Sequence, residues 1–462
     1  MSAKPDTRFS RLGHALQLLI TGKVKLIKFP TIASLLAVSI LCSLRTSSAQ
    51  DAAAVDPSVN LASGSDAGMQ PDSPSQIAPP TTPDEAAALE QSLYGQDQAI
   101  ADAAPEPDAQ SRPWRFNLHA SADSHYDDNI FISSAARQSD LVTRLTAGGG
   151  FTLGDYTAKQ DNYLISDYTG IGELFGRHGY EDAYEQNASL DSQVRLAHLT
   201  LRGAFQFQDL ADEDIEIGAR TRRQIYTGNF SARYDISDKS YLEATDQVTI
   251  ANYDLYLDST DERGGLSFNY LPDPAFTIGI GAMGGILNVQ DSGSQTYEQL
   301  LASSQVDVTS KFTLKASAGA EDRQFEDAGS ITTPVFDLTG DYNPFDGLDL
   351  SLTAYRRVLN SAFYSGYDYI GTGVDAAVQY QFSSQFTLLL NGGYENSAYR
   401  AITTGAIISR ADDYYYVRPA LRYTASPWCN VEIYYFYRTD DSNVATSCFY
   451  DTQAGATLNF TY

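Results

Sequence analysis

The chain has 462 residues, a formal net charge of −27 and only 19% charged residues. It contains 31 Tyr and 21 Phe, and beyond residue 50 Lys occurs only at positions 159, 239, 311 and 315. This composition argues against a helix-rich soluble protein, which needs more helix-forming Lys and Glu. The acidic balance also excludes nucleic acid as a natural partner, because phosphate backbones would be repelled.

The first segment has the pattern of an export signal. Residues 1–50 carry seven Lys or Arg, and an apolar run of 14 residues extends from Thr31 to Leu44. This run is too short for a helix that spans a bilayer, which needs ~20 residues. Ser47 and Ala49 are small residues of the kind that precede a cleavage site. We expect residues 1–49 to be a signal peptide, with an uncleaved N-terminal anchor as the alternative.

The next segment, residues 50–112, is rich in Ala, Asp, Pro, Ser and Gln and contains no Lys or Phe. Segments that combine low hydrophobicity with a single sign of charge bury too little apolar surface to fold. We therefore expect residues 50–112 to form a disordered linker.

From residue 113 onward, apolar and polar residues alternate with a period of two. Val374, Ala376 and Val378 share one face of such a segment, and Asp375 and Gln379 share the other. This alternation predicts β-strands rather than helices. Similar strand starts recur at intervals of 36, 36, 38 and 43 residues, at Phe276, Phe312, Leu348, Phe386 and Cys429. Each interval fits one hairpin, so we predict about 18 strands, between 16 and 20.

The connections between the expected strands are of two kinds. Tight turns such as Asn343-Pro-Phe-Asp-Gly alternate with longer loops. The longer loops are expected at 127–140, 209–221, 360–367, 397–411 and 440–450. Long strands with short turns at one end are typical of a transmembrane antiparallel up-and-down β-barrel, which leaves no open edge in lipid. A secreted soluble β-sandwich or β-solenoid is the alternative.

The last strand alternates up to the aromatic Tyr462. It is similar to the C-terminal strand that bacterial outer-membrane barrels present to the barrel-assembly machinery. We therefore expect residues 113–462 to form a barrel in contact with outer-membrane lipid. An even number of strands would place both termini in the periplasm.

Near the start of the barrel the chain reads Tyr126-Asp127-Asp128-Asn129-Ile130-Phe131. Together with the signal, the acidic linker and the full barrel, this motif resembles the β-barrel porin type 2 family of outer-membrane proteins. The resemblance covers roughly residues 113–462. It implies a barrel with a pore function, linked in some members to exopolysaccharide systems, and it supplies no catalytic residues.

Charged residues of both signs fall on the polar face of the expected strands. Opposed charges could form a constriction that orients polar solutes, or they could pair along a hydrated wall, and the sequence leaves both open. The candidates for the pore lining are Arg195, Arg202, Arg233, Glu243, Asp307, Lys315, Glu321, Asp375, Arg418, Arg422 and Glu432.

Aromatic residues also fall on the inner face, at Tyr414, Tyr416, Tyr434 and Phe436. They could stack on sugar rings, but packing against a folded-in loop is the favoured interpretation. The loops 127–140 and 397–411 are the candidates for folding inward, although they could also remain outside.

Two acidic loop segments offer oxygen ligands of the kind that divalent cations prefer. They comprise Asp123, Asp127, Asp128 and Asn129, and Asp212, Glu213, Asp214 and Glu216. Their spacing does not match an EF-hand loop, and the Cys residues lack the spacing of a zinc site. Solvated surface charge is therefore the favoured interpretation, and we expect neither a metal nor a cofactor.

The sequence thus predicts a porin-like protein that passes small polar solutes such as neutral sugars or glycans. A non-conducting barrel that acts as an adhesin or structural surface protein is the alternative. We do not expect an enzyme. An outer-membrane hydrolase is a minor alternative, and its candidates are His125 beside Asp127 and Asp128, and His178 near Glu181 and Asp182.

Overall fold

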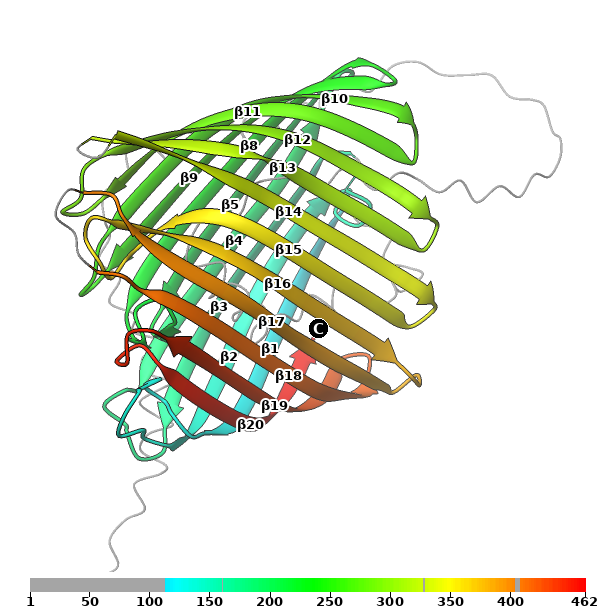
Figure 1. Cartoon of the computed structure of the whole chain (residues 1–462). Coiled ribbons are helices and arrows are strands. Elements are labelled where there is room, and N and C mark those ends of the chain that lie inside the picture. The colour runs from blue at the N-terminus through cyan, green and yellow to red at the C-terminus, as the bar shows by residue number, and fades with distance from the viewer. Residues whose placement is uncertain (1–112, 160, 327–328, 404–407) are drawn as a thin grey trace, which may run out of the picture. The chain divides into compact units, whose positions relative to one another are not determined.

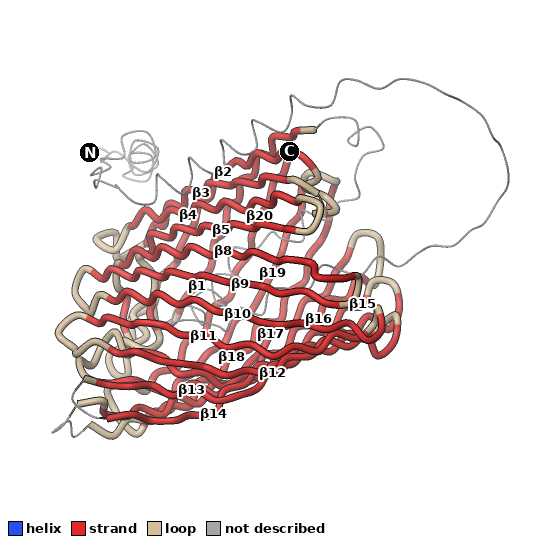
Figure 2. Tube along the Cα trace, turned by 90° about the horizontal axis from the view of Figure 1, so that it is seen from above, coloured by secondary structure: helices blue, strands red, loops and turns tan. Residues whose placement is uncertain are grey.

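The computed structural model describes residues 113–462 except 160, 327–328 and 404–407. The expected signal peptide, 1–49, and the expected linker, 50–112, lie outside the described residues. The described residues are drawn as strand or loop in Figure 2. None of them forms a helix that is long and apolar enough to cross a membrane.

Eighteen long strands form one antiparallel sheet (Figure 1). The sheet is closed because β1 pairs with β2 on one side and with the last strand, β20, on the other. This confirms the predicted up-and-down barrel and its strand number. The strands are β1 (Trp114–Asp127), β2 (Asp140–Gly154), β3 (Tyr163–Phe175), β4 (Ala183–Arg195), β5 (Leu199–Leu210), β8 (Arg223–Ser237), β9 (Ser240–Tyr253), β10 (Ser259–Asp273), β11 (Phe276–Val289), β12 (Gln295–Thr309), β13 (Phe312–Phe325), β14 (Gly329–Phe345), β15 (Leu348–Asn360), β16 (Tyr367–Gln381), β17 (Phe386–Ala401), β18 (Ala411–Ser426), β19 (Cys429–Ser442) and β20 (Phe449–Thr461), and a separate two-stranded sheet joins β6 (Glu213–Asp214) to β7 (Ala219–Arg220).

The two faces of the barrel differ in polarity. On β19, Ile433 and Tyr435 are exposed on the outer face, whereas Glu432, Tyr434 and Phe436 are buried on the inner face. Other strands follow the same rule, with large apolar side chains outside and polar or charged side chains inside. A soluble barrel would bury its apolar face instead, so this polarity is that of a barrel surrounded by lipid.

Aromatic side chains gather at the end of the barrel that carries the short turns. Aromatic rings touch there, with centroids 5.1–6.3 Å apart. A ring of aromatic side chains is typical of the position where a barrel leaves the hydrocarbon layer. The pairs are Phe312 with Tyr342, Phe345 with Tyr380, Phe386 with Tyr423, and Trp428 with Phe460.

The predicted asymmetry of the connections is present. Asp346-Gly347 joins β14 to β15, and Gly347 has a φ of +87°, a conformation that glycine adopts without strain. The turns 238–239, 274–275 and 310–311 are equally short, whereas 155–162 is a longer connection at the same end. The opposite end carries the loops 128–139, 176–182, 211–222, 254–258, 290–294, 361–366, 402–410 and 443–448.

The motif at 126–131 closes the seam between the first and the last strand. The ladder between β1 and β20 ends where Asp127 lies opposite Gln453. Beyond this rung, the side chain of Asn129 donates to the backbone oxygens of Tyr450 (2.9 Å) and Ser133 (3.1 Å), and it accepts from the Ser133 amide (3.0 Å). Asn129 is fully buried. The motif therefore replaces backbone pairing with side-chain hydrogen bonds where the two strands separate.

The tip of the β15–β16 hairpin bends into the barrel. The ladder between β14 and β15 stops at Phe336 and Arg356, although both strands continue beyond that rung. Asp368 on β16 forms an ion pair with Arg323 (3.2 Å), which lies on the inner face of β13. The adjoining loop, 361–366, accepts a backbone hydrogen bond from Leu257. The hairpin tip thus lies against the inner wall instead of continuing the cylinder.

Candidate functional site

The loop 211–222, between β5 and β8, crosses the lumen. It carries the short strands β6 and β7. Ile215 packs against Tyr416 and Phe436, which belong to β18 and β19 on a distant part of the ring. Ile217 packs in a second cluster, with Ile225 and Tyr253 of β8 and β9 and with Ala362 of the tucked hairpin. The favoured interpretation of the inner aromatic residues, packing against a folded-in loop, is confirmed for this cluster.

Ion pairs fix this loop to the far wall. The carboxylate of Glu213 lies 3.2 Å from the guanidinium of Arg438 on β19, and Arg438 also bonds Asp451 at 2.8 Å. On the other side, Arg220 of β7 pairs with both Glu213 and Glu173. Burial opposes ionisation of Glu213, but the charges of Arg220 and Arg438 outweigh it and hold the pKa of Glu213 at about 2.

We expect Arg438→Gln to release this loop. The substitution leaves the buried carboxylate of Asp451 without its cation and Glu213 with Arg220 alone, and breaking a buried ion pair typically costs about 3–5 kcal/mol. Limited proteolysis of the detergent-purified protein should show faster tryptic cleavage after Arg220 and Arg222. Lys239→Gln, which removes a cation at a short turn, is the control and should leave the rate of cleavage after Arg220 and Arg222 unchanged. Equal resistance in both variants would contradict the anchoring role.

The loop 211–222 contacts the inward-bent tip of the β15–β16 hairpin through Glu216. Its carboxylate accepts hydrogen bonds from the Ser361 hydroxyl (2.6 Å), the Ala362 amide (3.1 Å) and the Tyr399 hydroxyl (3.3 Å). Burial, reinforced by the negative charge of Asp214, raises the pKa of Glu216 to about 7. The two infolded segments therefore share one titratable contact.

Acidification is expected to favour the closed state, in which Glu216 contacts Ser361 and Ala362. A carboxyl group whose pKa is about 7 in the closed state and about 4.5 in water stabilises closure below pH 4.5, and it loses this contribution as the pH rises through 7. The ratio of closed to open states should therefore rise by roughly two orders of magnitude between pH 8 and pH 4.5. Single-channel records across this range should show longer low-conductance periods at low pH.

The matched variant for this prediction is Glu216→Gln, which is always neutral and keeps an acceptor oxygen. It should lose the pH-dependent step and resemble the acidified native chain at every pH. A native step that survives in Glu216→Gln would assign the titration to another group.

The acidic residues of this loop correct one interpretation made from the sequence. Asp212, Glu213, Asp214 and Glu216 were expected to be solvated surface charge, but Asp214 and Glu216 are buried. Asp212 pairs with Arg223 at 2.9 Å, and Asp214 accepts a hydrogen bond from Tyr253 at 3.3 Å. Arg223 is close in sequence, but Arg438, the partner of Glu213, and Ser361, the partner of Glu216, are 225 and 145 residues away, which local composition does not reveal.

The two loops that were expected to fold inward contribute less to the packing inside the lumen than the loop 211–222 does. The first, 128–139, places Ile132 in the cluster around Phe436, and the second, 402–410, buries Arg410 near the mouth. The alternation of Ile215 and Ile217 with Asp214 and Glu216 is the sequence signal that distinguishes the crossing loop.

All eleven predicted pore-lining residues occupy inner-face positions in the strand alternation, but the structure brings only some of them together. Arg418 and Arg422 share Glu432, at 2.7 and 3.0 Å, and Glu243 lies opposite Arg233 in the β8–β9 ladder. The others lie apart on the wall: Arg202 bonds Gln193, Asp375 accepts from Tyr416, Asp307 accepts from Thr313, Lys315 lies 3.7 Å from Asp341, Glu321 pairs with Arg323, and Arg195 is exposed at the end of β4. The predicted residues therefore lie on several separate parts of the inner wall.

The carboxylates of Asp127, Asp128 and Asp451 lie close enough together to hold a cation, within 4.8 Å. Each already has protein donors: Asp127 accepts from the Asn129 amide, and Asp451 accepts from Arg438. Asp128 accepts from the backbone amide of Thr452. These bonds give the cluster a structural role in the seam.

The histidines have different acidic partners from those expected. His125 Nδ1 lies 2.6 Å from Asp123 rather than beside Asp127 or Asp128. His178 Nδ1 lies 2.8 Å from Asp140 rather than from Glu181 or Asp182. The acid–histidine pairs on which the hydrolase alternative rested are therefore not those the sequence suggested.

Comparison with known proteins gives three findings. Residues 288–462 match the family "Putative beta-barrel porin 2". The matched segment runs from the end of β11 to the end of the chain and confirms the family resemblance over that part of the barrel. No curated protein matches the chain.

The barrel is also similar to solved structures from Pseudomonas aeruginosa. OpdK with vanillate is 12% identical, with a TM-score of 0.40 and coverage of 75% of this chain and 99% of that one. OpdQ has the same identity and TM-score, with coverage of 75% and 98%. OccK7 (OpdD) is 11% identical, with a TM-score of 0.40 and coverage of 76% and 98%.

Proposed function

We propose that this chain is a pore of the bacterial outer membrane through which small polar solutes diffuse. One observation carries the proposal: the loop 211–222 crosses a wide barrel whose inner face is polar. A non-conducting barrel has no need for a loop held inside its lumen by buried ion pairs. The family match over residues 288–462 supports the same function.

The wall favours solutes without strong negative charge. Residues 113–462 hold 23 Lys and Arg against 46 Asp and Glu. Like charges repel in a narrow passage of low dielectric, so a polyanionic polysaccharide is a poor cargo. Neutral sugars or glycans fit better, and a link to exopolysaccharide export remains part of the proposal. Phe436 is fully buried under the loop, so the aromatic cluster is not a free platform for sugar stacking.

In this proposal the short turns face the periplasm and the long loops face outward, so that both termini are periplasmic. The C-terminal strand that ends at Tyr462 would be the segment presented to the barrel-assembly machinery. Residues 50–112 would lie at the periplasmic mouth.

The test is single-channel recording of refolded residues 50–462 in a planar bilayer, beside a version that lacks residues 50–112. Stable conductance steps with a mild preference for cations are expected, and added sugars that pass the pore should reduce the ion current. A folded barrel that conducts in neither version would contradict the pore and favour the adhesin or structural alternative.

A further inference from the structure

The barrel wall is split between β14 and β15. The β13–β14 ladder extends up to Gly329, and the β15–β16 ladder extends up to Asn360. The ladder between β14 and β15, however, ends at Phe336 and Arg356. Residues 329–335 therefore lack a strand partner on one side among the residues that the structure describes. The split arises because the tip of the β15–β16 hairpin has moved inward.

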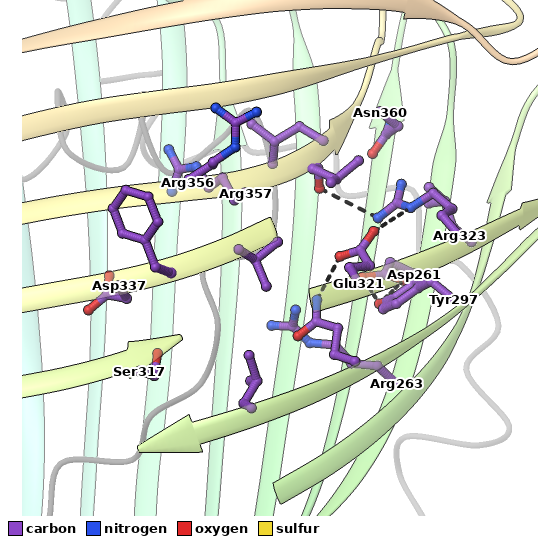
Figure 3. Close-up of a pocket in the computed structure, with 17 residues that line it drawn as sticks. Asp261, Arg263, Tyr297, Ser317, Glu321, Arg323, Asp337, Arg356, Arg357 and Asn360 are labelled. Carbon is purple, nitrogen blue, oxygen red and sulfur yellow. Dashed lines mark hydrogen bonds and ion pairs between the residues drawn. The ribbon is translucent and has the colours of Figure 1, made fainter. Parts of the chain in front are cut away.

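A pocket of about 50 Å³ lies at this split (Figure 3). Its walls combine apolar side chains with charged side chains of both signs. Val335, Phe336 and Leu359 line it, Arg323 and Arg356 reach it from β13 and β15, and the carboxylates of Asp261, Glu321 and Asp337 also line it. The lining provides an apolar surface, and the nearby arginines without ion pairs decide which charge it accepts.

Two arginines at the split lack an acidic partner among the described residues. Arg356 donates to the Thr372 hydroxyl (2.9 Å), and Arg400 on β17 donates to the Thr333 hydroxyl on β14 (2.8 Å). Nε of Arg356 and both Nε and Nη2 of Arg400 are buried without a hydrogen-bond partner. Asp368 and Glu321 attract Arg400 at longer range, and the charges of Arg323 and Arg356 repel it. Buried guanidinium groups without acceptors are costly, so this arrangement favours an anion between them.

The position of the split along the barrel axis indicates what kind of anion can reach it. Below it, the outer positions are apolar and exposed, as at Leu338, Leu352 and Val374. At the level of Arg356 the outer positions become polar, beginning with Thr372, which lies opposite Arg356 in the ladder. This change marks the boundary between the hydrocarbon layer and the lipid head groups.

We propose that Arg356 and Arg400 bind a phosphate group of an outer-leaflet glycolipid, whose apolar part rests against Phe336 at the split. The phosphate accepts the hydrogen bonds that these guanidinium groups cannot make within the protein. Phosphate matches the planar donor geometry of arginine. The inference rests on the proposed orientation, in which the long loops face outward, and not on conductance.

The test is lipid binding by residues 50–462 in detergent, with purified bis-phosphorylated lipid A as the probe and native mass spectrometry as the readout. Arg356→Gln combined with Arg400→Gln should weaken lipid A binding at least about tenfold. Arg177→Gln combined with Lys239→Gln removes two exposed cations elsewhere and should bind like the native chain. The heat-dependent shift of the folded band in gels checks that each variant is folded.

A second variant, Arg356→Lys with Arg400→Lys, keeps both charges and should retain most of the binding. Inorganic phosphate, added as a competitor at the same phosphate concentration, separates a lipid site from a site for free anions. Equal binding by the Gln variant and the native chain would overturn the proposal. Full displacement by inorganic phosphate would overturn the lipid assignment.

Discussion

Replacing residues 212–221 by two glycines is expected to raise the single-channel conductance at least about twofold. The loop lies across the lumen, with Ile215 against one part of the wall and Ile217 against another. An 18-stranded barrel without such a loop is too wide to be filled by its own side chains. Removing the loop should therefore expose the full cross-section to ions.

Two of the ion-pair partners of the loop keep other acidic or basic contacts after this deletion. Arg438 retains Asp451, and Glu173 retains Arg144 at 3.8 Å. The control is an equivalent shortening of the 155–162 connection at the opposite end, which should leave conductance unchanged. If the loop deletion also conducts like the native chain, the loop is not the constriction.

Asn129→Leu is expected to destabilise the closed barrel by about 3 kcal/mol or more. Asn129 is fully buried and makes three hydrogen bonds with Ser133 and Tyr450. Leucine would leave the buried backbone groups of these partners unsatisfied, and each such loss costs roughly 1–3 kcal/mol. The measurement is the temperature at which the folded band disappears in heat-modifiability gels.

Two further variants sharpen this test. Asn129→Asp keeps the acceptor for the Ser133 amide but loses the donors, so its loss of stability should be intermediate. Asn252→Leu changes the same residue type at an exposed position at the end of β9 and should be nearly neutral. A neutral Asn129→Leu variant would mean that the seam is held by the backbone ladder alone.

The barrel was predictable because its determinants are local and repeated. The alternation around Val374 and Asp375 assigns residues to the two faces, and the hairpin interval gives the strand number. A one-residue slip would move every apolar side chain to the lumen, so the pattern fixes the strand faces strongly. The inner-face positions of Arg418, Arg422 and Glu432 follow from the same rule.

The constriction was not predictable in the same way. Whether Glu213 is solvated or buried depends on Arg438, which lies 225 residues later in the chain. The inward bend of the β15–β16 hairpin depends on the pairing of Asp368 with Arg323, again between separate strands. Contacts of this kind depend on the assembled ring, and strand periodicity carries no information about them.

The inward folding of two loop segments also changes which side chains are exposed at the end of the barrel that carries the long loops. Segments 211–222 and 361–366 direct Glu216 and Ser361 toward each other. Side chains that protrude from other loops, such as Tyr180 and Leu255, are 73% and 84% exposed. In the proposed orientation, an antibody or a bacteriophage would therefore meet side chains of the loops 176–182 and 254–258. Sequence change in those two loops could alter recognition without altering the passage.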